Sequence, residues 1–116
     1  GLVDLIGIEH KVCPEITLRP TPGHTPGHVS INIESKGEKA FITGDLMHNP
    51  VQLEEPNRIV RFDMDQAAGA QSREAFVADM ANSDVLVIGS HFADPTAGYV
   101  VSDDDGCRLD TDQVSE

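Results

Sequence analysis

The sequence predicts an α/β domain: a mixed sheet with one main helix and a C-terminal hairpin. Residues 29–34 alternate apolar and polar side chains, as a half-buried strand does. Residues 66–82 are rich in Ala, Gln, Glu and Met, which favour a helix. Residues 85–88 form a continuous apolar run, typical of a strand buried on both faces. With 116 residues, of which 39% are hydrophobic, the chain suffices for one domain with a modest aliphatic core.

The first half of the chain is predicted to form strands. Residues 2–12 are apolar-rich and predict short strands, or a strand and a turn. Residues 16–19 alternate and predict a strand that ends at Pro20. Residues 29–34 and residues 40–43, separated by a Gly-containing turn, predict a β-hairpin.

The second half combines a loop, the helix and a second hairpin. Residues 49–65 contain two prolines and predict an irregular loop, which in a compact domain often forms a wall of an active site. Ser72 is a candidate start of the main helix within residues 66–82. Residues 98–101 and 107–109 flank an Asp-Gly turn, which is typical of a hairpin.

The ends of the chain carry few signals. Residues 110–116 are polar, and we expect them to fray. No positively charged segment followed by an apolar core marks a signal peptide at the N-terminus, and the compartment is left open. Cys13 and Cys107 lie far apart, so they form neither a Cys-x-x-Cys pair nor a disulfide framework.

The composition argues against two classes of partner. The formal net charge of −12 disfavours nucleic acid and anionic membranes, because both require a basic surface. No apolar run approaches the roughly 20 residues of a membrane span.

The stretch Thr21-Pro22-Gly23-His24-Thr25-Pro26-Gly27-His28 is the most informative segment. Two prolines stiffen it and two glycines permit turns, so little of it can be regular helix or strand. A rigid loop that presents imidazoles suits a metal site, whose ligands are held before the ion binds. The alternative is a structural turn whose histidines face solvent.

Three potential ligands follow predicted strands. His24 follows the strand that ends near Pro20, Asp45 follows residues 40–44, and His91 follows residues 85–89. Ligands gather where strands end in layered α/β folds, and two imidazoles with a carboxylate suit a divalent transition metal. Each residue also has a plain structural interpretation. Asp45 would cap a turn, and His91 would be a buried histidine bonded to a carbonyl.

Three motifs together carry a family resemblance: residues 21–28, Thr43-Gly44-Asp45-Leu46 and Gly89-Ser90-His91. In order and spacing the chain resembles the metallo-β-lactamase-fold hydrolases, over about Ile6 to Leu109. Residues 44–52 and the segment through Asp63 are most similar to the branch of methyl parathion hydrolase-like organophosphate hydrolases and related lactonases. The resemblance implies that residues 1–116 are the C-terminal part of one such domain, half of an αββα sandwich.

The resemblance also implies roles for five residues. His24 and His91 match ligands of the first and second metal, and Asp45 matches the carboxylate that bridges them and takes part in catalysis. His28 matches a position outside the ligand set, where it orients the loop by hydrogen bonding. His48 matches a pocket position, where it either donates a hydrogen bond to substrate or simply packs.

The family's His-x-His-x-Asp-His motif, which supplies four ligands, does not occur in these 116 residues. We therefore expect a truncated binuclear hydrolase, inactive without the upstream ligands, that holds no ion or one. A single ion would be held by His24, Asp45 and His91. The complete domain would hold two zinc or other divalent transition-metal ions, whose activated hydroxide attacks an ester, a lactone or a phosphotriester. The alternative is a non-catalytic assembly module that forms a homodimer through the apolar face of the half sandwich.

Overall fold

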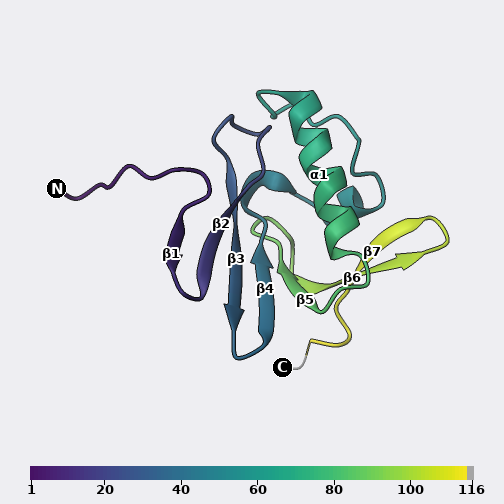
Figure 1. The fold of residues 1–116 in the computed structure, drawn as a ribbon. Coiled ribbons are helices and arrows are strands. Elements are labelled where there is room, and N and C mark those ends of the chain that lie inside the picture. Colours follow the sequence, from purple (N-terminus) through teal and green to yellow (C-terminus); the bar gives the residue numbers. More distant parts are fainter. Residues whose placement is uncertain (115–116) are drawn as a thin grey trace.

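The computed structural model describes residues 1–114, which form one mixed sheet with a helix on one side (Figure 1). Seven strands follow one another in space in the order β1 to β7. Only β4 and β5 pair in parallel; every other neighbouring pair is antiparallel. The elements are β1 Lys11–Cys13, β2 Ile16–Pro20, β3 Val29–Ser35, β4 Glu38–Ile42, the 3₁₀ helices η1 Gly44–Leu46 and η2 Pro50–Leu53, α1 Gln66–Met80, β5 Val85–Ile88, β6 Ala97–Asp103 and β7 Gly106–Asp110.

The predicted α/β class, the first hairpin, the main helix and the C-terminal hairpin are all confirmed. The helix begins at Gln66 rather than at Ser72, because the Asp65 side chain caps it by accepting a hydrogen bond from the Ala68 amide. Ser72 lies within α1 and donates to the Pro22 carbonyl, which ties the helix to the histidine-bearing loop.

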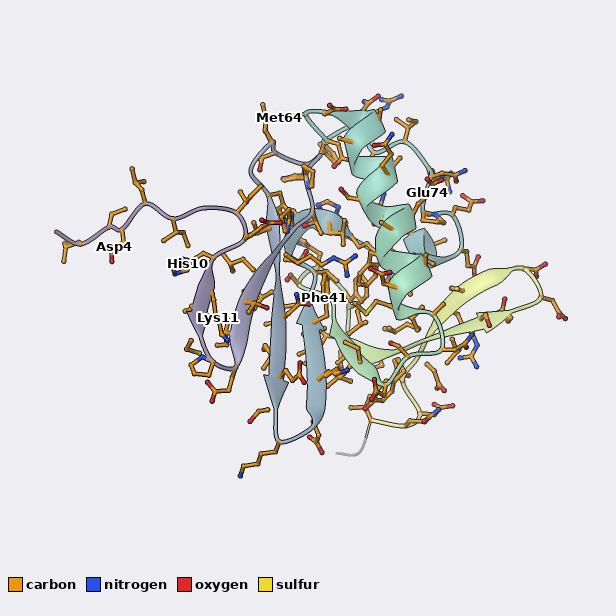
Figure 2. All side chains as sticks on the ribbon, in the orientation of Figure 1. Asp4, His10, Lys11, Phe41, Met64 and Glu74 are labelled. Atoms are coloured by element: carbon orange, nitrogen blue, oxygen red, sulfur yellow. The ribbon has the colours of Figure 1, made fainter. Side chains whose placement is uncertain are left out.

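Of the residues 2–12 predicted to form strand structure, Lys11 and Val12 lie in β1, whereas the prediction is wrong for residues 2–10. Leu2, Val3 and Leu5 are largely exposed, and the segment extends away from the sheet, as Figure 2 shows at Asp4. An apolar run forms a strand only where another strand or a core covers it. Within residues 1–114, regular pairing in this region is limited to β1.

The core lies between the sheet and α1. Phe41 of β4 and Phe76 of α1 are fully buried, with ring centroids 4.9 Å apart, and Val87 of β5 lies beside them in the same core. The opposite face of the sheet has no helix over it in residues 1–114. Its side chains alternate with the core residues and are only partly buried; they include Ile31, Ile33, Ile42, Leu86 and Ile88.

Residues 85–88 were predicted to form a strand buried on both faces. Because this face of the sheet is open, β5 is buried on one face only. The open face also explains the apolar composition of that strand, because Leu86 and Ile88 belong to a surface that only a second layer would cover. The arrangement is half of an αββα sandwich, as the fold class predicted.

After β7 the described part of the chain makes a turn at residues 112–113. Asp110 closes β7, and its carboxylate accepts hydrogen bonds from the Asp112 amide and the Gln113 side chain. Residues 115–116, part of the tail expected to fray, lie outside the described residues. Across residues 1–114, no helix has both the length and the apolarity needed to cross a bilayer.

Candidate metal centre

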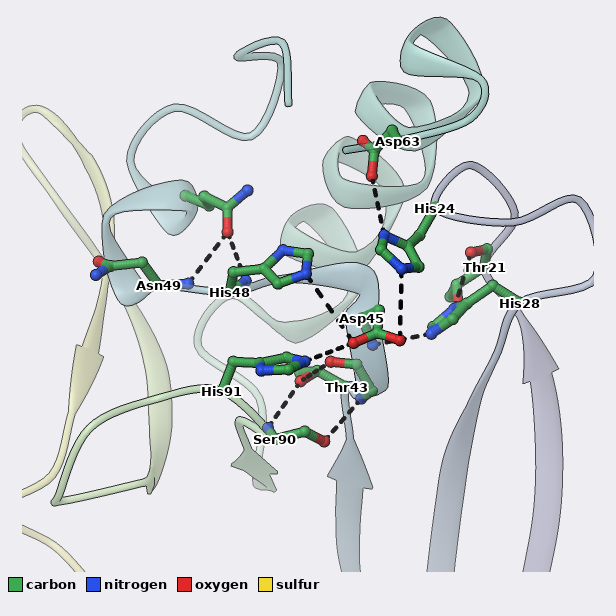
Figure 3. Close-up of polar contacts among 12 residues, drawn as sticks. Thr21, His24, His28, Thr43, Asp45, His48, Asn49, Asp63, Ser90 and His91 are labelled. Atoms are coloured by element: carbon green, nitrogen blue, oxygen red, sulfur yellow. Dashed lines mark hydrogen bonds and ion pairs between the residues drawn. The ribbon is translucent and has the colours of Figure 1, made fainter. Parts of the chain in front are cut away.

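The direction of the strands brings the predicted site residues to one edge of the sheet. β2 and β4 are each antiparallel to β3, and β5 is parallel to β4, so β2, β4 and β5 all run the same way. The segments that follow these strands therefore meet at one edge. His24 follows β2, Asp45 lies in η1 after β4, and His91 follows β5, and all three side chains converge there (Figure 3).

The two carboxylate oxygens of Asp45 face different histidines. Oδ1 accepts a hydrogen bond from His91 Nε2 at 2.5 Å and lies 4.0 Å from His48 Nε2. Oδ2 lies 3.6 Å from His24 Nε2. The carboxylate thus stands between two imidazoles on one oxygen and one imidazole on the other.

His28 holds the backbone of Asp45 rather than its side chain. His28 Nε2 accepts a hydrogen bond from the Asp45 amide at 2.9 Å, so the ring proton resides on Nδ1. Nδ1 donates in turn to Thr21, whose hydroxyl lies 2.8 Å away. The Thr21 hydroxyl donates to Ser30, and Ser30 donates to the Thr43 carbonyl at 2.9 Å. This chain of bonds joins the loop, β3 and the end of β4.

The ends of β4 and β5 are also fastened to each other. The Gly44 amide donates to Ser90 Oγ at 3.1 Å, and the Ser90 amide donates to Thr43 Oγ1 at 3.3 Å. Asp45 is the residue after Gly44, and His91 is the residue after Ser90. These bonds therefore fix Asp45 and His91 relative to one another.

His24 is positioned from behind by a buried ion pair. Its Nδ1 lies 3.7 Å from Oδ1 of Asp63, a carboxylate with no exposed surface, and neither atom has a hydrogen-bond partner among the described residues. The other oxygen of Asp63 accepts a hydrogen bond from Arg73 Nη1 at 2.8 Å. The Arg73 guanidinium is itself buried and also donates to the carbonyls of Pro56 and Arg58. This arrangement presents His24 Nε2 to Asp45.

His48 is held through its backbone. Its amide donates to Gln52 Oε1 at 2.6 Å, and Gln52 is buried in a capping box with Asn49. The His48 ring lies against that of His91, with centroids 4.8 Å apart and an angle of 30° between the planes.

The protonation of the site follows from these contacts. The hydrogen bond from His91 lowers the pKa of the Asp45 carboxyl, and the neighbouring His24 acts in the same direction. Asp45 is therefore ionised at neutral pH. Burial lowers the pKa of His48, and the nearby His91 lowers it further, so the His48 ring is neutral under the same conditions.

An ionised carboxylate surrounded by imidazole nitrogens is a donor set that divalent transition metals bind. The unpaired buried atoms of His24, His48 and Asp63 mark a polar site whose hydrogen bonding is incomplete among residues 1–114. The residues present therefore fit a divalent metal. His28 is the exception, because its Nε2 is occupied by the Asp45 amide.

Asp63 and Arg73 are the site residues that sequence reasoning missed. Arg73 lies on the same face of α1 as Phe76 and Met80, three and seven residues further on, and all three are buried. A charged residue on the buried face of a helix requires a partner, and this was the available signal. The partner itself, in the irregular loop, has no signature in the sequence.

The comparison with family models identifies the superfamily. The sequence model of the metallo-beta-lactamase superfamily matches residues 1–106, and the chain belongs to that superfamily. The resemblance stated from the motifs is thereby confirmed. A search of curated proteins returned no match.

Several solved structures share the fold. AidC, a dizinc quorum-quenching lactonase, superposes with a TM-score of 0.82 at 22% identity, over 96% of this chain and 38% of its own. The hydrolase AbOPH superposes with a TM-score of 0.82 at 24% identity, over 93% of this chain and 38% of its own. A probable metal-dependent hydrolase from Staphylococcus aureus superposes with a TM-score of 0.69 at 24% identity, over 90% of this chain and 39% of its own. The chain thus spans less than two fifths of the length of these structures.

Proposed function

We propose that this chain is the part of a metal-dependent hydrolase that carries three ligands of a two-ion centre: His24, Asp45 and His91. The position of Asp45 carries the proposal, because its oxygens face His24 on one side and His91 on the other. In this role Asp45 would serve as a ligand to both ions, and His24 and His91 would each hold one of them. The remaining ligands come from a His-x-His-x-Asp-His segment outside these 116 residues.

Zinc is the metal that the proposal favours. Imidazole and carboxylate ligands suit it, and the similar structure AidC is described as a dizinc enzyme. Two ions bind in a polypeptide that contains all the ligands. A pair of such ions supplies a water of lowered pKa and polarises the oxygen of the bond to be broken.

The chain's own residues provide the rigid frame for this chemistry. His28 and Ser90 fasten the backbone of η1 on both sides, so the Asp45 carboxylate is preorganised. Asp63 keeps Nε2 of His24 directed toward the centre. In this proposal the loop of residues 47–61, which carries His48, forms one wall of the substrate pocket.

The proposed substrate is a small molecule with an ester, lactone or phosphotriester bond. Among these bonds, the structural similarity to the lactonase AidC favours a lactone as the proposed substrate. The phosphotriester alternative rests on the sequence similarity of residues 44–52 to the organophosphate hydrolase branch.

The test joins residues 1–116 to a His-x-His-x-Asp-His segment and compares the wild type with Asp45→Ala. We expect two zinc ions per polypeptide by emission spectrometry, with hydrolysis of N-hexanoyl homoserine lactone. The variant should lose both metal and activity, because one residue serves both ions. Retention of two ions by the Asp45→Ala variant would disprove the bridging role.

A second candidate function is a non-catalytic module that forms a homodimer. The open sheet face favours it: the partly buried side chains of Ile31, Ile42 and Ile88 form a continuous aliphatic surface without a covering layer in residues 1–114. Sedimentation equilibrium of the 116-residue chain tests this function. A monomer at all accessible concentrations would contradict it, and Ile42→Glu should dissociate a dimer formed through this face.

A further inference from the structure

We infer that His48 is a metal ligand and that, with Asp45 and His91, it forms a site that holds one divalent transition-metal ion by residues of this chain alone. The inference rests on the proposed function only in placing metal at Asp45. It differs in its ligands, since it requires neither His24 nor any residue outside residues 1–116.

The geometry groups these three residues. One donor atom of each lies within 4.8 Å of the donor atoms of the other two. From Asp45 Oδ1, the distance is 2.5 Å to His91 Nε2 and 4.0 Å to His48 Nε2. Two ligands of one tetrahedral ion, each bound at about 2.0–2.1 Å, lie roughly 3.3 Å apart. The observed distances lie on either side of that value.

His48 has no competing polar role. Among residues 1–114 its ring makes no hydrogen bond: Nδ1 is buried without a partner, and Nε2 stands beyond hydrogen-bond distance of Asp45. His28 shows the contrast, because both of its ring nitrogens are engaged. An imidazole placed against a carboxylate with both nitrogens unused is suited to bind an ion.

The position of His48 is fixed independently of any metal. Gln52 accepts hydrogen bonds from the amides of His48 and Asn49, and the capping box holds Gln52 in place. The ring is also stacked on that of His91 (Figure 3). The two imidazoles therefore approach the same oxygen from neighbouring directions, as two ligands of one ion must.

His24 does not share this grouping. It faces the other oxygen of Asp45, at 3.6 Å, and Asp63 holds it from behind. The single-ion set expected from the sequence, His24 with Asp45 and His91, would require an ion to reach both sides of the carboxylate. A ligand set with His48 in the place of His24 has two imidazoles and a carboxylate oxygen on the Oδ1 side of Asp45. Such a set leaves coordination positions open to water.

The test is a titration of the 116-residue chain with Co²⁺, followed by calorimetry and by the visible absorption of the bound ion. Four variants are compared with the wild type: His48→Gln, His91→Gln, His24→Gln and His10→Gln. His10 is exposed and lies outside the site, which makes His10→Gln the matched control. Circular dichroism and thermal unfolding establish that each variant is folded.

We expect one Co²⁺ per wild-type chain, with unchanged affinity in His10→Gln and His24→Gln. His48→Gln and His91→Gln should each weaken binding by at least about tenfold, the scale of losses at metal sites, and change the absorption spectrum. A second measurement needs no variant. In the Zn²⁺-loaded wild type, nitrogen NMR should show the coordination shift at His48 and no such shift at His24.

Two results would overturn this inference while leaving the proposed function standing. One is binding that depends on His24 and not on His48. The other is a wild-type chain that binds no metal, because the two-ion centre draws further ligands from outside the chain. Binding that survives Asp45→Asn would overturn both.

Discussion

Gly44 lies directly against the imidazole of His28. Its φ is +59°, and a Cβ added there would stand 2.8 Å from His28 Nε2. The residue before Asp45 must therefore be glycine for two reasons: its backbone conformation, and the space that lets His28 reach the Asp45 amide.

Gly44→Ala should lower the free energy of unfolding and disturb the metal centre. The left-handed conformation alone costs about 1–2 kcal/mol for an alanine. The clash with His28 adds to this and breaks its bond to Asp45. Gly37→Ala is the matched control, since Gly37 has a φ of +82° with no neighbour within 4 Å of an added Cβ. Urea unfolding and Co²⁺ titration of both variants separate the two effects. Equal metal affinity in both would contradict the role assigned to Gly44.

Thr21→Val should weaken the hydrogen bonding that orients the His28 ring. Thr21 is buried, and its hydroxyl both accepts from His28 Nδ1 and donates to Ser30. Removing it leaves the Thr21 carbonyl, 3.1 Å from Nδ1, as the acceptor for His28 and takes one hydrogen bond from Ser30, at a cost of about 0.5–1.5 kcal/mol. Nitrogen NMR should show a changed tautomer population for His28. The control is Thr25→Val, an exposed position in the same loop. A His28 spectrum unaffected by Thr21→Val would mean that the backbone alone orients the ring.

Arg73→Ala should be among the most destabilising single substitutions. It leaves the fully buried Asp63 carboxylate without its partner, which typically costs about 3–5 kcal/mol. Arg58→Ala breaks an exposed ion pair with Glu55 and should cost no more than about 1 kcal/mol. Chemical denaturation of the two variants checks the difference. Similar losses in both would show that the buried pair is not a principal source of stability.

The two cysteines should differ in reactivity. Both are free thiols; Cys13 is partly exposed, whereas Cys107 is buried, and burial raises the pKa of the Cys107 thiol. Because the thiolate is the reactive form, one thiol per native chain should react quickly with Ellman's reagent. The second should react only after unfolding. Cys13→Ser should abolish the fast phase, and a fast phase that persists would contradict the burial of Cys107.

Much of the fold could be predicted because its signals are local. The alternation of residues 29–34 and the turn after them define the first hairpin, and the Asp-Gly turn defines the last. The strand structure predicted for residues 2–12 is wrong for residues 2–10 because an apolar run does not reveal whether anything covers it. The start of α1 was misplaced because Ser72 and Asp65 are both good caps, and only the tertiary contact with Pro22 distinguishes them.

The site was only partly predictable for a related reason. The positions of His24, Asp45 and His91 directly after predicted strands indicated that they meet at one edge of the sheet. The sequence could not show which oxygen of Asp45 each histidine faces. The Asp63–Arg73 pair was missed because ion pairs between a loop and a helix leave no periodic pattern.

Asp45 is attached to the sheet through backbone bonds on both sides, whereas the imidazoles around it arrive on separate loops. The carboxylate is thus a fixed reference, and His28 and Ser90 tie it to the loops that carry His24 and His91. A histidine can be exchanged on either loop while these ties keep the loop in place. A fold built this way can alter the coordination of its metals one residue at a time, which lets a single scaffold acquire new metal preferences by small steps.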